Sequence, residues 1–152
     1  MTGFAEIRGG RNLSRIARDL KQAGNGDLRK ELLAGIRKPV KAAIPDVRTA
    51  AATDLPKRGG LAARVAKQKY AARTSLSRSE ARVRLVGSGM KELDTIDQGR
   101  VRHPVWGDRQ VWKSQRVTPG FFSGTLSRKG PAIRQEIDRV MHAVARKIER
   151  GV

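Results

Sequence analysis

The residues best suited to acid–base or metal chemistry lie close together in the second half of the chain. They are Glu92, Asp94, Asp97, His103 and Asp108. Carboxylates beside an imidazole can transfer protons or bind a metal ion. The chain has only two histidines and no cysteine, however, and this group shows neither metal-ligand spacing nor a serine nucleophile motif. We therefore expect the acids to pair with neighbouring arginines, and we predict no catalytic residue, no metal and no cofactor.

Two glycine-containing segments are the candidates for a phosphate site. Neither "PKRGG" at 56–60 nor "GSG" at 87–89 has the glycines followed by Lys and Ser or Thr at a helix start that a phosphate loop needs. The sequence therefore predicts a protein that is not an enzyme.

Four of the six aromatic residues fall within "HPVWGDRQVWKSQRVTPGFF", residues 103–122. These four are Trp106, Trp112, Phe121 and Phe122. Aromatic side chains among arginines and lysines could stack on single-stranded nucleic acid. The two phenylalanines follow a Pro-Gly turn, however, and Phe122 precedes Leu126 by four residues, the spacing of one helical face. Trp106, between a proline and a glycine, is expected to plug a turn. We predict that the four aromatic residues anchor the fold and subunit contacts, with base stacking as the alternative.

The chain is strongly basic along its whole length. It has 33 Lys and Arg against 14 Asp and Glu, a formal net charge of +19, and the excess is not confined to one tail. Self-repulsion at this charge favours an acidic partner, in the first place nucleic acid.

One segment, 53–74, concentrates this charge. Pro56 and the Gly59-Gly60 pair interrupt regular structure there. The cations of this segment, with no acid among them, are Lys57, Arg58, Arg64, Lys67, Lys69 and Arg73. A charge run of this kind is often only a solvated face. Because it follows a glycine hinge, a protruding basic arm is the alternative.

Apolar residues at helical spacing predict three helical regions. The first covers 12–23, and the second covers 26–52, where Pro39 and Pro45 are expected to bend or split it. The third covers 131–149, with Pro131 at its start and a stripe that runs from residue 133 to Ile148. A shorter helix is expected around residues 122–126.

Alternation of apolar and charged residues predicts strands. Residues 69–75 and 81–87 form a hairpin, and 101–105 and 110–117 form two further strands. The short connections make the sheet antiparallel. The predicted class is α+β, with a small antiparallel sheet packed by N-terminal helices and a long C-terminal amphipathic helix. The predicted single domain, 1–152, has four parts: N-terminal helices at 12–52, a basic loop or arm at 53–68, antiparallel strands at 69–117 and C-terminal helices at 119–149.

The order of these segments resembles one protein family. "LPKRGGLAARV", a basic hairpin, "RHPVWGDRQVWKSQRVTPGFF" and a C-terminal amphipathic helix are similar to the tail-completion or neck (head–tail connector) proteins of long-tailed, siphovirus-type bacteriophages. The similarity covers about residues 13–148. Its motifs are structural and not catalytic.

The resemblance implies a homo-oligomeric ring, a hexamer, at the head–tail junction of the virion, around the channel for duplex DNA. Its implied partners are the adjacent connector or stopper, tail terminator and tail tube proteins. The basic arm would face the neighbouring ring, which we favour, or the DNA. No signal peptide or membrane span is expected, so the protein would be made in the host cytoplasm. The alternatives are a tail terminator that caps the tail tube and a free-standing, non-specific nucleic-acid-binding protein.

Overall fold

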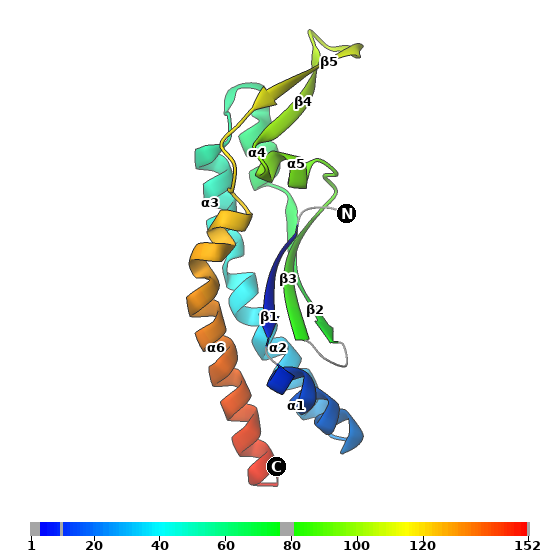
Figure 1. Cartoon of the computed structure of the whole chain (residues 1–152), viewed down its shortest axis with the longest axis vertical. Helices are drawn as coiled ribbons and strands as arrows, with labels where there is room; N and C mark the ends of the chain where they lie inside the picture. The colour runs from blue at the N-terminus through cyan, green and yellow to red at the C-terminus, as the bar shows by residue number, and fades with distance from the viewer. Residues whose placement is uncertain (1–3, 10, 77–80, 152) are drawn as a thin grey trace. The chain divides into compact units, whose positions relative to one another are not determined.

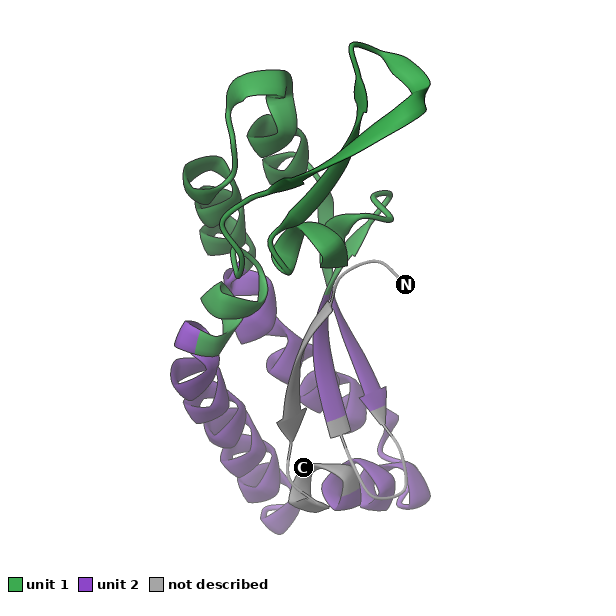
Figure 2. Ribbon diagram, turned by 45° about the horizontal axis from the view of Figure 1, so that its top comes forward, with its two compact units in different colours: residues 1–5, 44–71, 86–127 green, residues 6–43, 72–85, 128–152 purple. Residues whose placement is uncertain are grey.

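The computed structural model describes residues 4–9, 11–76 and 81–151, and side chains within 15–75 and 82–151. The described residues group into two compact units (Figure 2). Unit 1 comprises residues 1–5, 44–71 and 86–127, and unit 2 comprises residues 6–43, 72–85 and 128–152. The predicted α+β class is confirmed, with small antiparallel sheets and a long C-terminal helix. The single domain over 1–152 stays a prediction.

Three strands form the larger sheet, in the order β1–β3–β2 (Figure 1). They are β1 (Phe4–Gly9), β2 (Lys69–Leu76) and β3 (Ala81–Ser88). The predicted pairing of β2 with β3 is confirmed, and the end of their predicted turn, 77–80, lies outside the described residues. Val83 and Leu85 are fully buried, as their alternation with arginines indicated. Strand β1 was not predicted, because its six residues alternate too weakly to indicate a strand.

The N-terminal helices follow the predicted spacing. They are α1 (Arg11–Gln22), α2 (Gly26–Ala42) and α3 (Ile44–Asp54). The expected break falls at Ala43, so that Pro45 occupies the first turn of α3, where a missing N–H is tolerated, while Pro39 stays inside α2. The side chain of Asn25 accepts a hydrogen bond from the Leu28 N–H at 3.3 Å and caps α2.

Helix α6 (Ser123–Glu149) is longer than predicted. The prediction that it begins at Pro131 was wrong, because Pro131 lies inside it. The residue before a proline normally avoids helical geometry since its Cβ meets the proline ring, and here that residue is Gly130, which has no Cβ. The predicted short helix around residues 122–126 is therefore the first turn of α6. The predicted apolar stripe also ends early, because Ile148 is 45% exposed.

In unit 2, α2 and the C-terminal part of α6 run side by side (Figure 1). A Cβ added at Gly35 would lie 2.5 Å from Cγ1 of Val140, so only glycine permits this approach of the two helices. Lys147 and Glu31 form an ion pair across the same pair of helices. The buried side chains of this unit include Leu32, Ile36, Val40, Val83, Leu85, Ile133 and Ile137.

The segment that was predicted to be an irregular basic arm belongs to unit 1. Residues 53–68 instead contain a short 3-10 turn, η1 (Arg58–Gly60), and helix α4 (Leu61–Ala66). The prediction of a loop or arm over 53–68 was wrong because "LAARVA" buries Ala62 and Val65, three residues apart, beside α3. The cations of the segment lie on its solvent side.

The remaining elements of unit 1 are α5 (Leu93–Asp97), β4 (Arg100–Val105) and β5 (Asp108–Arg116). The third and fourth predicted strands are confirmed and pair antiparallel, from Arg100 opposite Arg116 to Pro104 opposite Trp112. They form a two-stranded sheet of their own and do not extend the β1–β3–β2 sheet.

Candidate interaction site

Asp97, one of the five residues of the acidic group, has a structural role in unit 1. Asp97 ends α5, and its carboxylate accepts hydrogen bonds from the N–H groups of Phe122 (2.8 Å) and Ser123 (3.2 Å). Its backbone carbonyl accepts a further bond from the Gly120 N–H at 2.8 Å. A carboxylate at a helix N-terminus satisfies free N–H groups and interacts favourably with the helix dipole. Asp97 therefore fixes the start of α6. The prediction that it pairs with a neighbouring arginine was wrong.

Replacing Asp97 with alanine should lower the free energy of unfolding by about 1–2 kcal/mol, the usual contribution of a helix cap. Urea unfolding monitored by circular dichroism measures this. Asp94→Ala is the matched control, since Asp94 also lies on α5 and makes no contact with α6 N–H groups among the described residues. Equal losses in the two variants would show that the cap has no particular effect.

Two of the four aromatic residues are core residues. Phe121 and Phe122 are 0% and 1% exposed, and their ring centroids lie 6.2 Å apart. Phe122 also stacks on Tyr70, with 5.9 Å between ring centroids. The Tyr70 hydroxyl donates a hydrogen bond to the Val65 carbonyl at 2.9 Å. The "PGFF" step thus returns the chain from β5 into the core of unit 1.

Burial raises the pKa of Tyr70 from 10.0 to about 12, with Arg48 lowering it and Asp97 raising it slightly. A raised pKa means that the fold favours the neutral phenol. The associated stability is present in full below pH 10 and is lost as the pH rises from 10 towards 12.

Tyr70→Phe should therefore cost about 1 kcal/mol at neutral pH through the lost hydrogen bond. Between pH 10 and 12 the wild-type protein should lose about 2–3 kcal/mol more than the variant, because phenylalanine cannot ionise. Denaturant unfolding of both proteins over this pH range measures the difference. Parallel pH curves would contradict the assignment.

The other two aromatic residues lie on the β4–β5 hairpin and are exposed. Trp106 is fully exposed and Trp112 is 48% exposed, next to Val111 at 50%. All nine residues of β5 are exposed. The prediction that Trp106 plugs a turn was wrong, because it lies at the tip of a hairpin and touches no core. Whether the two tryptophans make subunit contacts stays a prediction.

The hairpin turn has an unusual backbone. Trp106 has φ 54° and Gly107 has φ 81°, the pair of positive angles that defines a type I′ turn. Glycine adopts this conformation easily, but a bulky residue does so at a cost of about 1–3 kcal/mol. Asparagine is the usual residue at the first position, so the geometry of the turn does not explain the presence of a tryptophan.

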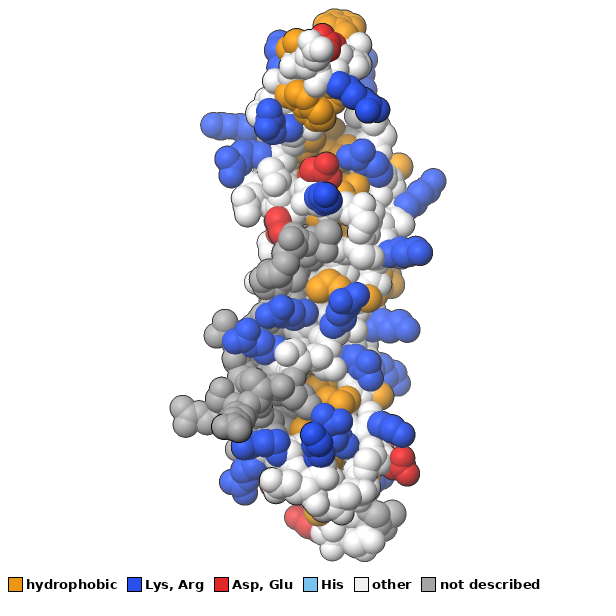
Figure 3. All heavy atoms as spheres, turned by 90° about the vertical axis from the view of Figure 1, so that its right-hand side faces the viewer, with side chains coloured by type: hydrophobic (Ala, Val, Ile, Leu, Met, Phe, Trp, Pro, Cys, Tyr) orange, Lys and Arg blue, Asp and Glu red, His pale blue; other side chains and the backbone are white. Residues whose placement is uncertain are grey.

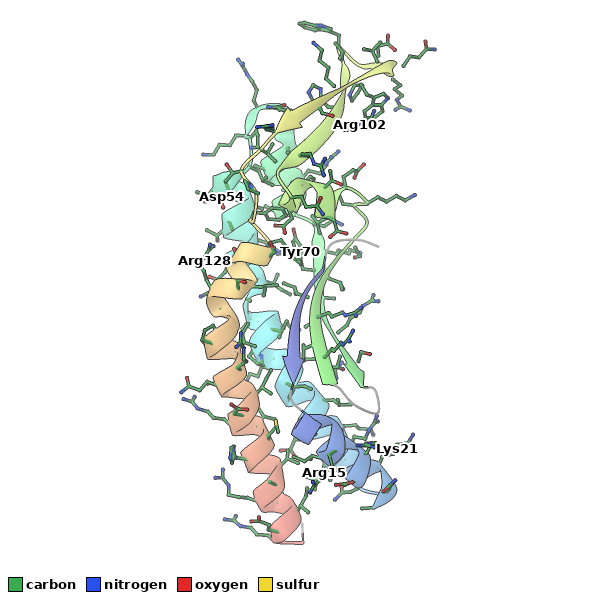
Figure 4. The ribbon with its side chains drawn as sticks, viewed as in Figure 1. Arg15, Lys21, Asp54, Tyr70, Arg102 and Arg128 are labelled. Carbon is green, nitrogen blue, oxygen red and sulfur yellow. The ribbon has the colours of Figure 1, made fainter. Side chains whose placement is uncertain are left out.

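Trp112 is held in place on one face of the hairpin. Its indole N–H donates to the Arg109 carbonyl at 2.8 Å, across the irregular part of the ladder where residues 109–111 have no partner on β4. The Arg102 guanidinium lies 5.9 Å from the ring centroid, within cation–π range. Figure 4 labels Arg102 on this hairpin.

A cleft of about 530 Å³ lies beside this face of the hairpin, within unit 1. The η1–α4 segment contributes Arg58 and Arg64 to its lining, and the hairpin contributes Arg102, His103 and Trp112. Its apolar lining includes Pro56, Leu61, Val101, Pro104 and Val117. Volumes in this range are typical of sites that bind small ligands or peptide segments. Neither the cleft nor Arg102 was singled out from the sequence, because the segments that line it are far apart in the chain.

The six predicted arm residues are all exposed, but they lie on different elements. Arg58 is in η1 and Arg64 in α4, both at the cleft, while Lys67 follows α4. Lys69 and Arg73 lie on β2, and Lys57 precedes η1. In the view of Figure 3, Lys and Arg side chains are spread over the surface with few acids among them.

Within residues 4–9, 11–76 and 81–151, no cluster of three His, Cys, Asp or Glu side chains is arranged to hold a metal ion. The helices of this part of the chain are too short or too polar to cross a membrane. No known protein family, no curated protein and no solved structure matches this chain.

Proposed function

We propose that this chain is a structural subunit of a ring at the head–tail junction of a long-tailed bacteriophage, where it joins the head or connector to the tail around the DNA channel. The order of segments in the sequence resembles neck proteins of such phages, and the β4–β5 hairpin provides the kind of surface that a ring subunit needs. A tail terminator that caps the tail tube is the alternative place for the same ring.

The observation that carries the proposal is the exposed aromatic tip of the hairpin. The left-handed backbone of Trp106 costs stability in an isolated chain, and the fully exposed side chain gains nothing from burial to offset that cost. A tryptophan that is exposed in the free subunit and becomes buried at the centre of a contact is among the largest contributors to binding energy between proteins. A residue that is unfavourable in the free subunit and favourable in a contact indicates an assembled working state.

The head-to-tail contacts of a ring of identical subunits place different surfaces of one chain against each other. A projecting hairpin fits one half of such a contact. The net charge of +19 supports the same proposal, since each copy adds positive charge around a channel that carries DNA.

The second candidate is a free-standing nucleic-acid-binding protein, which the charge and the stacked Arg102–Trp112 pair favour. A stacking platform needs several exposed aromatic rings, and Phe121 and Phe122, half of the aromatic block, are buried. Among the aromatic side chains that the structure describes, this arrangement leaves the two tryptophans of the hairpin for bases.

Immunogold electron microscopy of particles released from the cell that encodes this chain tests the proposal. An antibody raised against the purified protein should label one position, the junction of head and tail, on intact particles. An antibody to the major capsid protein is the control and should label the whole head. Label that is absent from particles and instead follows nucleic acid in the lysate would contradict the proposal and favour the second candidate.

A further inference from the structure

The cleft beside the hairpin combines positive charge with apolar walls. Three arginines contribute to its lining, Arg58, Arg64 and Arg102, against a single acid, Glu92. Neither Arg58 nor Arg64 has an ion-pair partner among the described residues. Guanidinium groups bind carboxylates through paired, charge-assisted hydrogen bonds, so these two are available for an anionic group.

The backbone holds these arginines at the cleft. Gly59 and Gly60 have φ of 79° and 76°, so two consecutive left-handed residues turn the chain between Arg58 and the start of α4. One arginine lies just before this turn and the other lies on α4, and both line the cleft. The turn is therefore part of the construction of the cleft.

The walls exclude a purely ionic ligand. Leu61, Val101, Pro104 and Val117 offer apolar surface, and Trp112 presents its ring beside them. Because the lining combines arginines with apolar residues, a matching ligand carries both carboxylates and apolar side chains. An extended peptide in which acidic and apolar residues alternate has this pattern. Strand β5 is exposed along its whole length, so an extended segment could also pair along the sheet edge.

We propose that this cleft binds an acidic, extended peptide segment of an adjacent protein in the assembly. A nucleic-acid strand fits it less well, because the aliphatic walls have no counterpart in a sugar–phosphate backbone. The inference deepens the proposed function, on which the choice of an adjacent protein rests. It also gives a location to the docking role that was expected of Arg58 and Arg64.

The test uses a fluorescent octapeptide that alternates Glu or Asp with Val or Leu, and fluorescence anisotropy with the full-length protein. The wild-type protein should bind it more tightly than a version with Gln and Asn in place of the acids. Arg58→Gln with Arg64→Gln should raise the Kd for the acidic peptide about tenfold or more, through the loss of two charge-assisted contacts. The matched control is Arg18→Gln with Lys21→Gln, two exposed cations of α1 whose removal changes the net charge equally. Figure 4 labels Lys21 on that helix.

Equal weakening in the two double variants would mean attraction by net charge alone and would overturn the inference. Tighter binding of an oligothymidine of the same net charge, lost in the cleft variant, would overturn it in favour of nucleic acid. The tryptophan emission of a Trp106→Phe protein gives an independent readout, since Trp112 is then the only tryptophan. Its emission should shift when the acidic peptide binds, and an unchanged emission at saturating peptide would also overturn the inference.

These outcomes are separable from those of the proposed function. The peptide could bind through the cleft arginines while the antibody fails to label particles. This result would support the inference and contradict the proposed role in a ring. A labelled head–tail junction with no peptide binding would remove only the inference.

Discussion

Phe122→Ala should lower the free energy of unfolding by about 3–5 kcal/mol, as truncation of a fully buried phenylalanine does in a protein core. Phe122 is 1% exposed and contacts the rings of Phe121 and Tyr70. Its N–H is also the donor nearest to the Asp97 carboxylate, at 2.8 Å, so a shift of this residue disturbs the start of α6. Because a small domain is stable by only about 5–15 kcal/mol, the variant should be largely insoluble or partly unfolded at 37 °C.

Thermal and urea unfolding measure the effect. Trp112→Ala is the internal control, because Trp112 comes from the same aromatic block but is half exposed. We expect this control to unfold within about 1 kcal/mol of the wild-type protein. If the Trp112 variant lost as much stability as the Phe122 variant, the division of the block into core and surface residues would be wrong.

Trp106→Asn should have opposite effects on the isolated chain and on its assembly. Asparagine before glycine is the preferred pair in a type I′ turn, so the substitution relieves the cost of a left-handed tryptophan. The isolated chain should gain about 0.5–1 kcal/mol of stability. Assembly should weaken about thirtyfold or more, since exposed tryptophans that anchor a contact contribute about 2 kcal/mol or more.

Unfolding of the monomer and light scattering over a range of concentrations, with and without neighbouring tail proteins, measure the two effects. Trp106→Phe is the matched control, because it keeps an aromatic ring at the tip and should retain most of the assembly. An asparagine variant that assembles as well as the wild-type protein would show that Trp106 is not an anchor.

The sequence predicted the parts of the fold that depend on local pattern. The helical stripe of α2, the alternation at Val83 and Leu85, and the pairing of β4 with β5 are present as expected. The first two follow from a spacing that faces one side of an element towards a core. The pairing of β4 with β5 follows from their short connection.

The errors arose where distant residues decide the local structure. Helix α6 begins at Ser123, well before Pro131, because Asp97 binds the N–H groups there and Gly130 allows the proline to continue the helix. The segment at 53–68 looked like a loop because of Pro56 and two glycines, but Ala62 and Val65 are buried in unit 1. Neither contact can be read from the neighbouring residues alone.

The candidate site was only half predictable. Aromatic residues are usually buried, so residue type alone does not separate Trp106 and Trp112 from Phe121 and Phe122. The "WG" pair between two alternating segments was the available signal, because a residue followed by glycine between strands indicates a two-residue hairpin loop. A turn of that kind places its first residue at an exposed tip, and the exposure of Trp106 follows.

The most direct test of the account replaces Trp106 with a photoreactive benzoylphenylalanine and irradiates the assembled particles. We expect the hairpin tip to lie against a neighbouring protein of the ring or of the adjoining tail. Mass spectrometry should then find position 106 joined to another copy of this chain or to one specific virion protein. The same residue placed at position 18, on the exposed face of α1, is the control for random capture. Attachment of position 106 to nucleic acid alone, or no more attachment than at position 18, would contradict the account.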